Sequence, residues 1–381
     1  MNYPFLILGG SGFISAGIAG KWYGYTGTAS VAIWLMAVGM IMLTLAVLRT
    51  TYYRSGTPWP DDSGEPRVLR LKPLHYMKAL VCWFDSYMRT YTIAPGLYYT
   101  GDRYDPEKPL LVTSNYLLTV LVLIRRVRSY NVRLLVIDTD GINVWCSAGK
   151  GRFSNLEIFR QLVRYQELLL SIDKRLTMIL PKFSLSGVDL RMLRQAYVRP
   201  VVGPLYAKDL PGYLANPPYR DSNDIVHFGF QSRLFTWLPG LGQFLGYCLA
   251  LVLVLFGLQI LFGFAVPWKI LVITALIATM YPLLFPYIPG DRFAVKGLWL
   301  GVFVSLMLIP GVFVNAVQWA DFPMTVPFIF ATGLFTGLAY TGNSAVSNYS
   351  AVRKEIARFL PVNVLLYVAA LIAFIVTEVY R

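Results

Sequence analysis

Hydrophobic positions divide the chain into long apolar runs at both ends and a mixed, charge-rich segment between them. Most acidic and basic residues fall between Thr51 and Phe235, whereas the flanking stretches contain few. A run of about 20 apolar residues is long enough to cross a bilayer as a helix. The pattern therefore predicts two membrane regions that flank one soluble domain.

The first membrane region is predicted to be a hairpin over residues 1–50. Its apolar runs cover Phe5–Ala19 and Ala29–Leu48, and the first basic residue, Lys21, follows the first run. A signal peptide carries its basic residues ahead of the apolar core, so two membrane helices are the better interpretation. The function of this hairpin stays open.

The second membrane region, 235–381, is predicted to contain five membrane-spanning helices. The five apolar runs are Trp237–Phe264, Ile270–Tyr287, Leu298–Val314, Pro327–Tyr340 and Phe359–Thr377.

Basic residues predict the orientation of these helices. One loop carries Arg292 and Lys296 and another carries Arg353, Lys354 and Arg358, whereas the alternate loops are nearly uncharged. Basic loops face the cytoplasm. We therefore expect a multi-pass protein of the inner (cytoplasmic) membrane whose soluble domain is cytoplasmic.

The soluble domain, 95–234, alternates between strand and helix patterns. Residues 51–94 precede it as a linker with an amphipathic helix over Leu74–Met88, which suits the membrane surface. Such alternation predicts an α/β fold, a Rossmann-like parallel sheet with helices on both faces. The expected elements are, in order, strand Leu110–Thr113, helix Leu117–Val127, strand Val132–Asp138, helix Leu156–Leu170, strand Leu176–Leu180, helix Val188–Gln195 and strand Val198–Val202.

Charge and cysteine content narrow the classes of function. The formal charge of +14 suits a chain that meets anionic headgroups, and no basic stripe accompanies a nucleic-acid-binding motif, so we expect no nucleic-acid partner. The three cysteines are Cys82, Cys146 and Cys248, with no Cys-x-x-Cys pair. This count disfavours a disulfide framework and an iron–sulfur cluster of the chain's own.

Cys146 is the candidate for chemistry. It follows a predicted strand, and ligands of open α/β sheets lie at the carboxyl ends of the strands. Its small neighbours Ser147, Ala148 and Gly149 leave space on one side, and the charge of Lys150 favours a thiolate. A structural role as a small buried side chain remains the alternative.

The segment Asn143-Val144-Trp145-Cys146-Ser147-Ala148-Gly149-Lys150 closely resembles the signature of the HgcA family of mercury-methylating corrinoid proteins, which usually have Ala at the position of Ser147. The resemblance extends over about Pro95 to Leu214. It includes Leu111-Val112-Thr113-Ser114-Asn115-Tyr116, Ile179-Leu180-Pro181 and Val202-Gly203-Pro204.

The resemblance implies a base-off cobalamin, a corrinoid whose cobalt is bound by the Cys146 thiolate. The histidine-bearing sequence Asp-x-His-x-x-Gly of other cobalamin proteins is absent. The implied activity is methyl transfer to Hg(II), with an iron–sulfur ferredoxin (HgcB-like) as reductant and a separate methyltransferase as methyl donor. The implied cofactor-binding residues are Asn143, Val144, Trp145, Cys146, Ser147, Ala148, Gly149, Lys150, Thr113, Ser114, Asn115, Pro181 and Gly203.

Individual roles keep alternatives. Asn143 suits a helix cap, Trp145 suits packing on the corrin or in the core, and Lys150 suits contact with a corrin side chain or with solvent. Two other functions also stay open. One is a corrinoid methyl carrier in one-carbon or acetyl-CoA metabolism, and the other is a membrane transport or assembly protein without a cofactor.

Overall fold

The computed structural model describes residues 65–70, 73–85, 91–170, 174–219, 225–241, 269–313, 322–344, 347 and 349–379. The described residues form two compact units that divide between His227 and Phe228. The expected N-terminal hairpin lies outside the described residues, as does most of the apolar run Trp237–Phe264. Each unit is described by itself.

The first unit is built on a six-stranded sheet with the order β1-β2-β4-β3-β5-β6. Strands β3, β4, β5 and β6 are parallel, β2 runs antiparallel to β4, and β1 is parallel to β2. The strands are β1 (Arg67–Val68), β2 (Gly96–Tyr99), β3 (Leu110–Ser114), β4 (Arg133–Ile137), β5 (Leu176–Leu180) and β6 (Val198–Val202).

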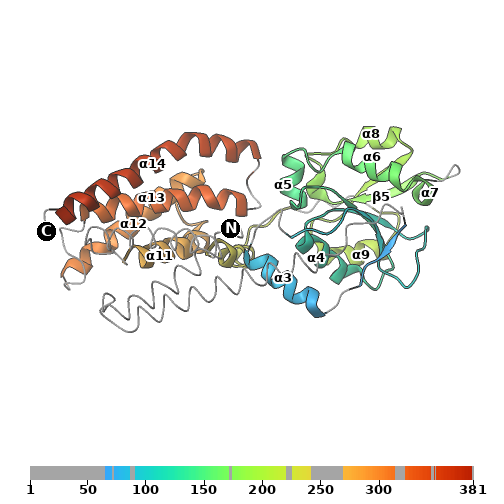
Figure 1. Cartoon of the computed structure of the whole chain (residues 1–381), viewed down its shortest axis with the longest axis horizontal. Coiled ribbons are helices and arrows are strands. Elements are labelled where there is room, and N and C mark those ends of the chain that lie inside the picture. The colour runs from blue at the N-terminus through green and yellow to red at the C-terminus, as the bar shows by residue number, and fades with distance from the viewer. Residues whose placement is uncertain are drawn as a thin grey trace. The chain divides into compact units, whose positions relative to one another are not determined.

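Helices cover both faces of this sheet, and β3 and β4 are accordingly buried along their whole length. Such fully buried strands need an apolar layer on each side. Figure 1 shows α3, α4 and α9 on one face and α5, α6 and α8 on the other. The helices are α3 (Pro73–Asp85), α4 (Leu117–Val127), α5 (Val144–Gly149), α6 (Asn155–Arg164), α7 (Gln166–Leu169), α8 (Leu190–Gln195) and α9 (Leu210–Ala215).

The α/β prediction is confirmed for the parallel core, but the sheet is larger and mixed. Strands β1 and β2, and helix α3 with them, come from the segment before Leu110, where no strand was predicted. The single helix predicted over Leu156–Leu170 is wrong, because α6 ends at Arg164 and the backbone of the next residue, Tyr165, leaves helical geometry (φ −111°, ψ 26°) before α7 begins. The Tyr165 side chain is buried in the core, so packing of this side chain accompanies the break.

The second unit contains helices long and apolar enough to cross a membrane. Among the described residues these are α12 (Phe293–Phe313), α13 (Phe322–Tyr340) and α14 (Tyr349–Val379), while α11 (Lys269–Leu284) is shorter at 16 residues. Helices α12 and α13 meet through glycines, since a Cβ on Gly297 would lie 2.1 Å from the Gly333 carbonyl oxygen. Such close backbone approach is typical of packed membrane helices.

The predicted boundary of the last span is wrong. Helix α14 begins ten residues before Phe359, so Arg353, Lys354 and Arg358 lie within its first turns and not in a loop. The exposed start of a helix tolerates charges, and the apolar pattern identified only the part that is uniformly hydrophobic. Arg292, in contrast, does lie in the short connection between α11 and α12.

Candidate functional site at the carboxyl edge of the sheet

The carboxyl ends of the parallel strands meet at one edge of the sheet. From β3 the chain passes through α4 to β4 on one side, and from β4 it returns through α5, α6 and α7 to β5 on the other side of β3. The strand order therefore reverses at β3, and this is the place where open α/β sheets bind ligands.

A tight turn leads from β4 toward α5. Asp140 and Gly141 both adopt left-handed backbone conformations, with φ of 59° and 64°, and the Ile142 amide donates to the Thr139 carbonyl at 3.2 Å. An Asp-Gly pair is well suited to such a turn. The turn reverses the chain before the helix that carries Cys146.

Asn143 caps α5, as the sequence predicts. Its backbone is extended and its side-chain Oδ1 accepts a hydrogen bond from the Cys146 amide at 2.9 Å. A cap of this kind satisfies one of the unpaired amides of the first turn and stabilises a helix by about 1 kcal/mol. The helix ends at Gly149, and Gly151, two residues further on, has a left-handed φ of 69°.

The two faces of α5 differ in burial. Val144, Ser147 and Ala148 are buried, whereas Trp145 and Cys146 are half-buried and both Gly149 and Lys150 are exposed. The prediction that Ser147 and Ala148 leave space for a ligand is wrong. Their small side chains are on the inner face, where Gly187 packs so closely that a Cβ there would lie 2.9 Å from the Ala148 Cα.

The thiol of Cys146 is therefore on the accessible side of a helix whose other side is fixed in the core. Burial raises the pKa of this thiol above its ordinary value, and the Lys150 charge and the Asn143 hydrogen bond oppose the shift only in part. The prediction that Lys150 favours a thiolate has the right direction, but burial outweighs it. Burial thus favours the neutral thiol over the thiolate in the free chain.

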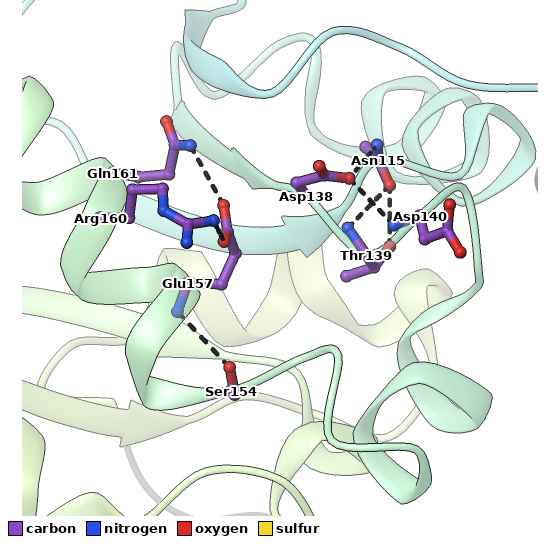
Figure 2. Close-up of polar contacts among 8 residues, drawn as sticks. All are labelled: Asn115, Asp138, Thr139, Asp140, Ser154, Glu157, Arg160 and Gln161. Atoms are coloured by element: carbon purple, nitrogen blue, oxygen red, sulfur yellow. Dashed lines mark hydrogen bonds and ion pairs between the residues drawn. The ribbon is translucent and has the colours of Figure 1, made fainter.

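Asn115 joins the end of β3 to the turn after β4 (Figure 2). Its Oδ1 accepts from the Thr139 amide at 3.0 Å, the Thr139 hydroxyl at 2.8 Å and the Gly141 amide at 3.0 Å, and its Nδ2 donates to Asp138 Oδ1 at 3.0 Å. Asn115 is 1% exposed. These four hydrogen bonds of the side chain position the loop that leads to α5, so the structure gives Asn115 a positioning role.

The remaining predicted residues lie around the same edge but differ in accessibility. Thr113 and Ser114 are buried, and Ser114 Oγ has no hydrogen-bond partner. Pro181 is half-buried and begins a short 3-10 helix, Lys182–Ser184, that packs on α5. Gly203 is buried, and a Cβ there would meet the Ile179 side chain at 3.0 Å, so its small size serves packing between β5 and β6.

A second polar cluster at the start of α6 was not predicted. Ser154 Oγ accepts a hydrogen bond from the Glu157 amide at 3.5 Å and so caps α6 (Figure 2). Glu157 is only 6% exposed, and its carboxylate forms an ion pair with Arg160. The Ser-x-x-Glu spacing is the signal of a capping box. It fixes the start of the helix that follows the Cys146 segment.

No group of three or more His, Cys, Asp or Glu side chains that could hold a metal ion occurs among the described residues. What the edge offers instead is one soft sulfur donor.

Comparison with known proteins adds no identification, because no family model, no curated protein and no solved structure matches this chain.

Proposed function

We propose that this chain is a membrane-anchored, corrinoid-dependent methyltransferase that methylates Hg(II) with Cys146 as the axial cobalt ligand. The observation that carries the proposal is the position of Cys146. Its thiol is half-buried on the accessible side of α5, and α5 lies at the edge of the sheet where the strand order reverses. The resemblance of the surrounding eight residues to the HgcA family supplies the cofactor.

The residues present fit a base-off corrinoid. Cys146 supplies one soft ligand, Asn143 fixes the first turn from which that ligand projects, and the exposed Gly149 adds no side chain beside it. When bound, the corrinoid supplies a transferable methyl group on a redox-active metal. Coordination to a metal deprotonates a thiol outright, so the raised pKa of free Cys146 is no obstacle to this role.

Cys146 would act by donating electron density to the cobalt. A thiolate is a soft, strongly donating ligand. With a corrinoid bound, this donation would favour transfer of a methyl group to an electrophilic substrate such as Hg(II). This assigns Cys146 the central role and leaves the inner-face residues Val144, Ser147 and Ala148 to hold the helix.

The proposed reaction needs two partners. Methyl transfer to Hg(II) leaves the cobalt oxidised, and the chain has no Cys-x-x-Cys pair of its own. An iron–sulfur ferredoxin (HgcB-like) is therefore the proposed reductant, and a separate methyltransferase is the proposed methyl donor.

The α/β unit is proposed to face the cytoplasm. Phe228, where the second unit begins, packs against Phe285 and Tyr340, with ring centroids 6.0 and 6.2 Å apart. The same end of the helix bundle holds the start of α12, because the Tyr281 hydroxyl donates to the Phe293 carbonyl at 2.7 Å. The basic start of α12 and the junction thus share one end, which the positive-inside rule assigns to the cytoplasm.

The direct test uses the full chain in detergent, reconstituted with cobalamin under reducing conditions. We expect the wild type to show a thiolate-ligated, base-off spectrum and to methylate Hg(II) when loaded with methylcobalamin. Cys146→Ala should lose both, with methylmercury formation reduced more than about 100-fold, because loss of the ligand itself exceeds the usual effect of losing an outer partner.

Cys82→Ala is the matched control, because Cys82 is a buried thiol that donates to the Tyr116 hydroxyl at 3.4 Å and takes no part in the proposed chemistry. It should bind corrinoid as the wild type does. Full Hg(II) methylation by Cys146→Ala would refute the proposed ligand. A wild-type chain that binds corrinoid but methylates only a cellular acceptor would indicate a methyl carrier, and one that never acquires corrinoid absorbance would refute the proposal altogether.

A further inference from the structure

Helix α3 has one face packed on its own unit and one exposed face that no other described helix or strand covers. The packed face contains Cys82, which is fully buried and donates to the Tyr116 hydroxyl at 3.4 Å next to the start of α4. Helix α3 contacts α4 along this side. The helix is therefore anchored to the sheet through α4.

The opposite side of α3 exposes large apolar residues. Leu74, Met77 and Leu80 follow one another at three-residue spacing and are 54%, 64% and 62% exposed, and Tyr76 beside them is 46% exposed. Residues three or four apart lie on one side of a helix. Scattered apolar residues are normal on a surface, but a continuous stripe on one helix marks an interaction site.

Basic residues outnumber acidic ones around this stripe. Residues 65–85 include the basic residues Arg67, Arg70, Lys72 and Lys78 and the acidic residues Glu65 and Asp85, so basic residues are in excess, although Arg70 also forms an exposed ion pair with Asp102 at 2.9 Å. A helix with an apolar stripe and basic flanks suits the interface of a bilayer that contains anionic lipids, where each nearby basic residue contributes about 1 kcal/mol. A protein partner with an apolar groove would account for the stripe but not for the excess of basic residues, unless that partner is also acidic.

The rest of the chain keeps a bilayer within reach. Three described helices, α12, α13 and α14, are long and apolar enough to cross a membrane, and the chain passes from the α/β unit into the second unit at Phe228. The α/β unit is thus tethered beside lipid at all times. Interfacial binding of α3 then costs little additional translational freedom.

We propose that the Leu74, Tyr76, Met77 and Leu80 face of α3 lies in the headgroup region of an anionic membrane. The helix has 13 residues, which corresponds to a length of about 20 Å. Contact along this length would hold one face of the sheet toward the membrane and leave the α6 face, on the other side, directed to solvent (Figure 1). This inference stands independently of the proposed methyl transfer.

The test places a fluorophore on α3 in the full chain in nanodiscs. Met77→Cys is labelled with an environment-sensitive dye in a chain whose Cys146 and Cys248 are replaced by serine. The discs contain phosphatidylglycerol and phosphatidylcholine with brominated acyl chains, which quench a dye that reaches the upper acyl region. We expect quenching of at least about half the emission, since interfacial helices insert about 5–10 Å. Quenching should weaken in discs of phosphatidylcholine alone.

Val163→Cys is the matched control, because Val163 is 68% exposed on α6 at the opposite face of the sheet. Its dye should be quenched by aqueous iodide and not by brominated lipid. The proposal is overturned if the Met77 dye is open to iodide and insensitive to lipid. It is equally overturned if the dye is shielded from both quenchers, because that result places protein on this face. Lys78→Glu should reduce lipid quenching of the Met77 dye, and no change would contradict the electrostatic part.

Discussion

Asn115 shows how much one buried amide determines at this sheet edge. Three donors from the turn after β4 converge on its Oδ1, and its Nδ2 donates to the carboxylate of Asp138. A buried donor or acceptor that loses its partner costs about 1–3 kcal/mol. The position of the turn, and of the helix beyond it, therefore depends on this residue. The substitution Asn115→Asp keeps the oxygen that accepts these hydrogen bonds but removes the amide group that donates to Asp138.

In Asn115→Asp the acceptor oxygen remains, but a second carboxylate oxygen replaces the group 3.0 Å from Asp138 Oδ1. Repulsion from the neighbouring carboxylate raises the pKa of the carboxyl introduced at position 115 above its unfolded value of about 3.9. Stability is then fully present below the unfolded pKa and is lost as pH rises through the folded pKa. We expect the variant to be about 2–4 kcal/mol less stable than the wild type at pH 7.5 and to recover most of this loss near pH 4.

Thermal melting of the detergent-solubilised chain at the two pH values measures this difference. Asn216→Asp is the control, because the Asn216 side chain makes one exposed hydrogen bond, to the Gly212 carbonyl at 3.2 Å. Its stability relative to the wild type should hardly depend on pH. An Asn115→Asp variant that melts like the wild type at pH 7.5 would show that the turn is held by other contacts.

At the scale of elements, the placement of α5 depends on close backbone packing. A Cβ on Gly187 would lie 2.3 Å from the Phe153 carbonyl oxygen and 2.9 Å from the Ala148 Cα. Because both neighbours are backbone atoms, Gly187→Ala must displace α5 or the segment of Gly187. We expect a loss of about 1–3 kcal/mol in stability and weaker cobalamin binding in an absorbance titration of the full chain.

Gly212→Ala provides the matched comparison. Gly212 lies within α9 and a Cβ there would meet no atom within 4 Å. Because alanine favours a helix over glycine, this variant should be about 0.5–1 kcal/mol more stable than the wild type, with unchanged cobalamin binding. Wild-type binding by a destabilised Gly187→Ala would separate the packing of α5 from its proposed function.

The sequence predicts elements well where one local pattern decides them. Helix Leu117–Val127 and strands Leu176–Leu180 and Val198–Val202 have the predicted bounds, since their apolar runs end at polar or turn residues. The orientation of α5 was beyond the sequence, because six residues carry too little periodicity to show which side is buried. The sequence also did not show that Asn115 positions the turn after β4, because its hydrogen-bond partners follow it in the chain only after helix α4 and strand β4.

At the scale of the whole molecule, hydrogen bonds within the membrane unit bring its basic segments to one end. Glu355 Oε1 accepts from the Ala294 amide at 2.5 Å, which places the start of α14 beside the start of α12. Arg292 and Arg353 therefore belong to the same end of the bundle. The sequence predicted this common side from charge alone, although it assigned Arg353 to a loop.

This arrangement predicts which positions face the cytoplasm. Tyr287 is 80% exposed in the connection between α11 and α12, at the basic end, whereas Pro323 lies at the start of α13, whose far end, Tyr340, packs near Phe228. In a chain with Cys146 and Cys248 replaced by serine, Tyr287→Cys should react with a membrane-impermeant maleimide only in inside-out vesicles. Pro323→Cys should react only in right-side-out vesicles.

Labelling of both positions from the same side would contradict the crossing of α12. Labelling in the reverse sense would instead leave the helices intact but place the α/β unit outside the cytoplasm. That outcome would remove the reducing compartment on which a cobalt-bound thiolate and a ferredoxin partner depend. The side of the membrane on which Tyr287 is labelled thus tests the proposed chemistry at Cys146 through a residue of the other unit, without any assay of methyl transfer.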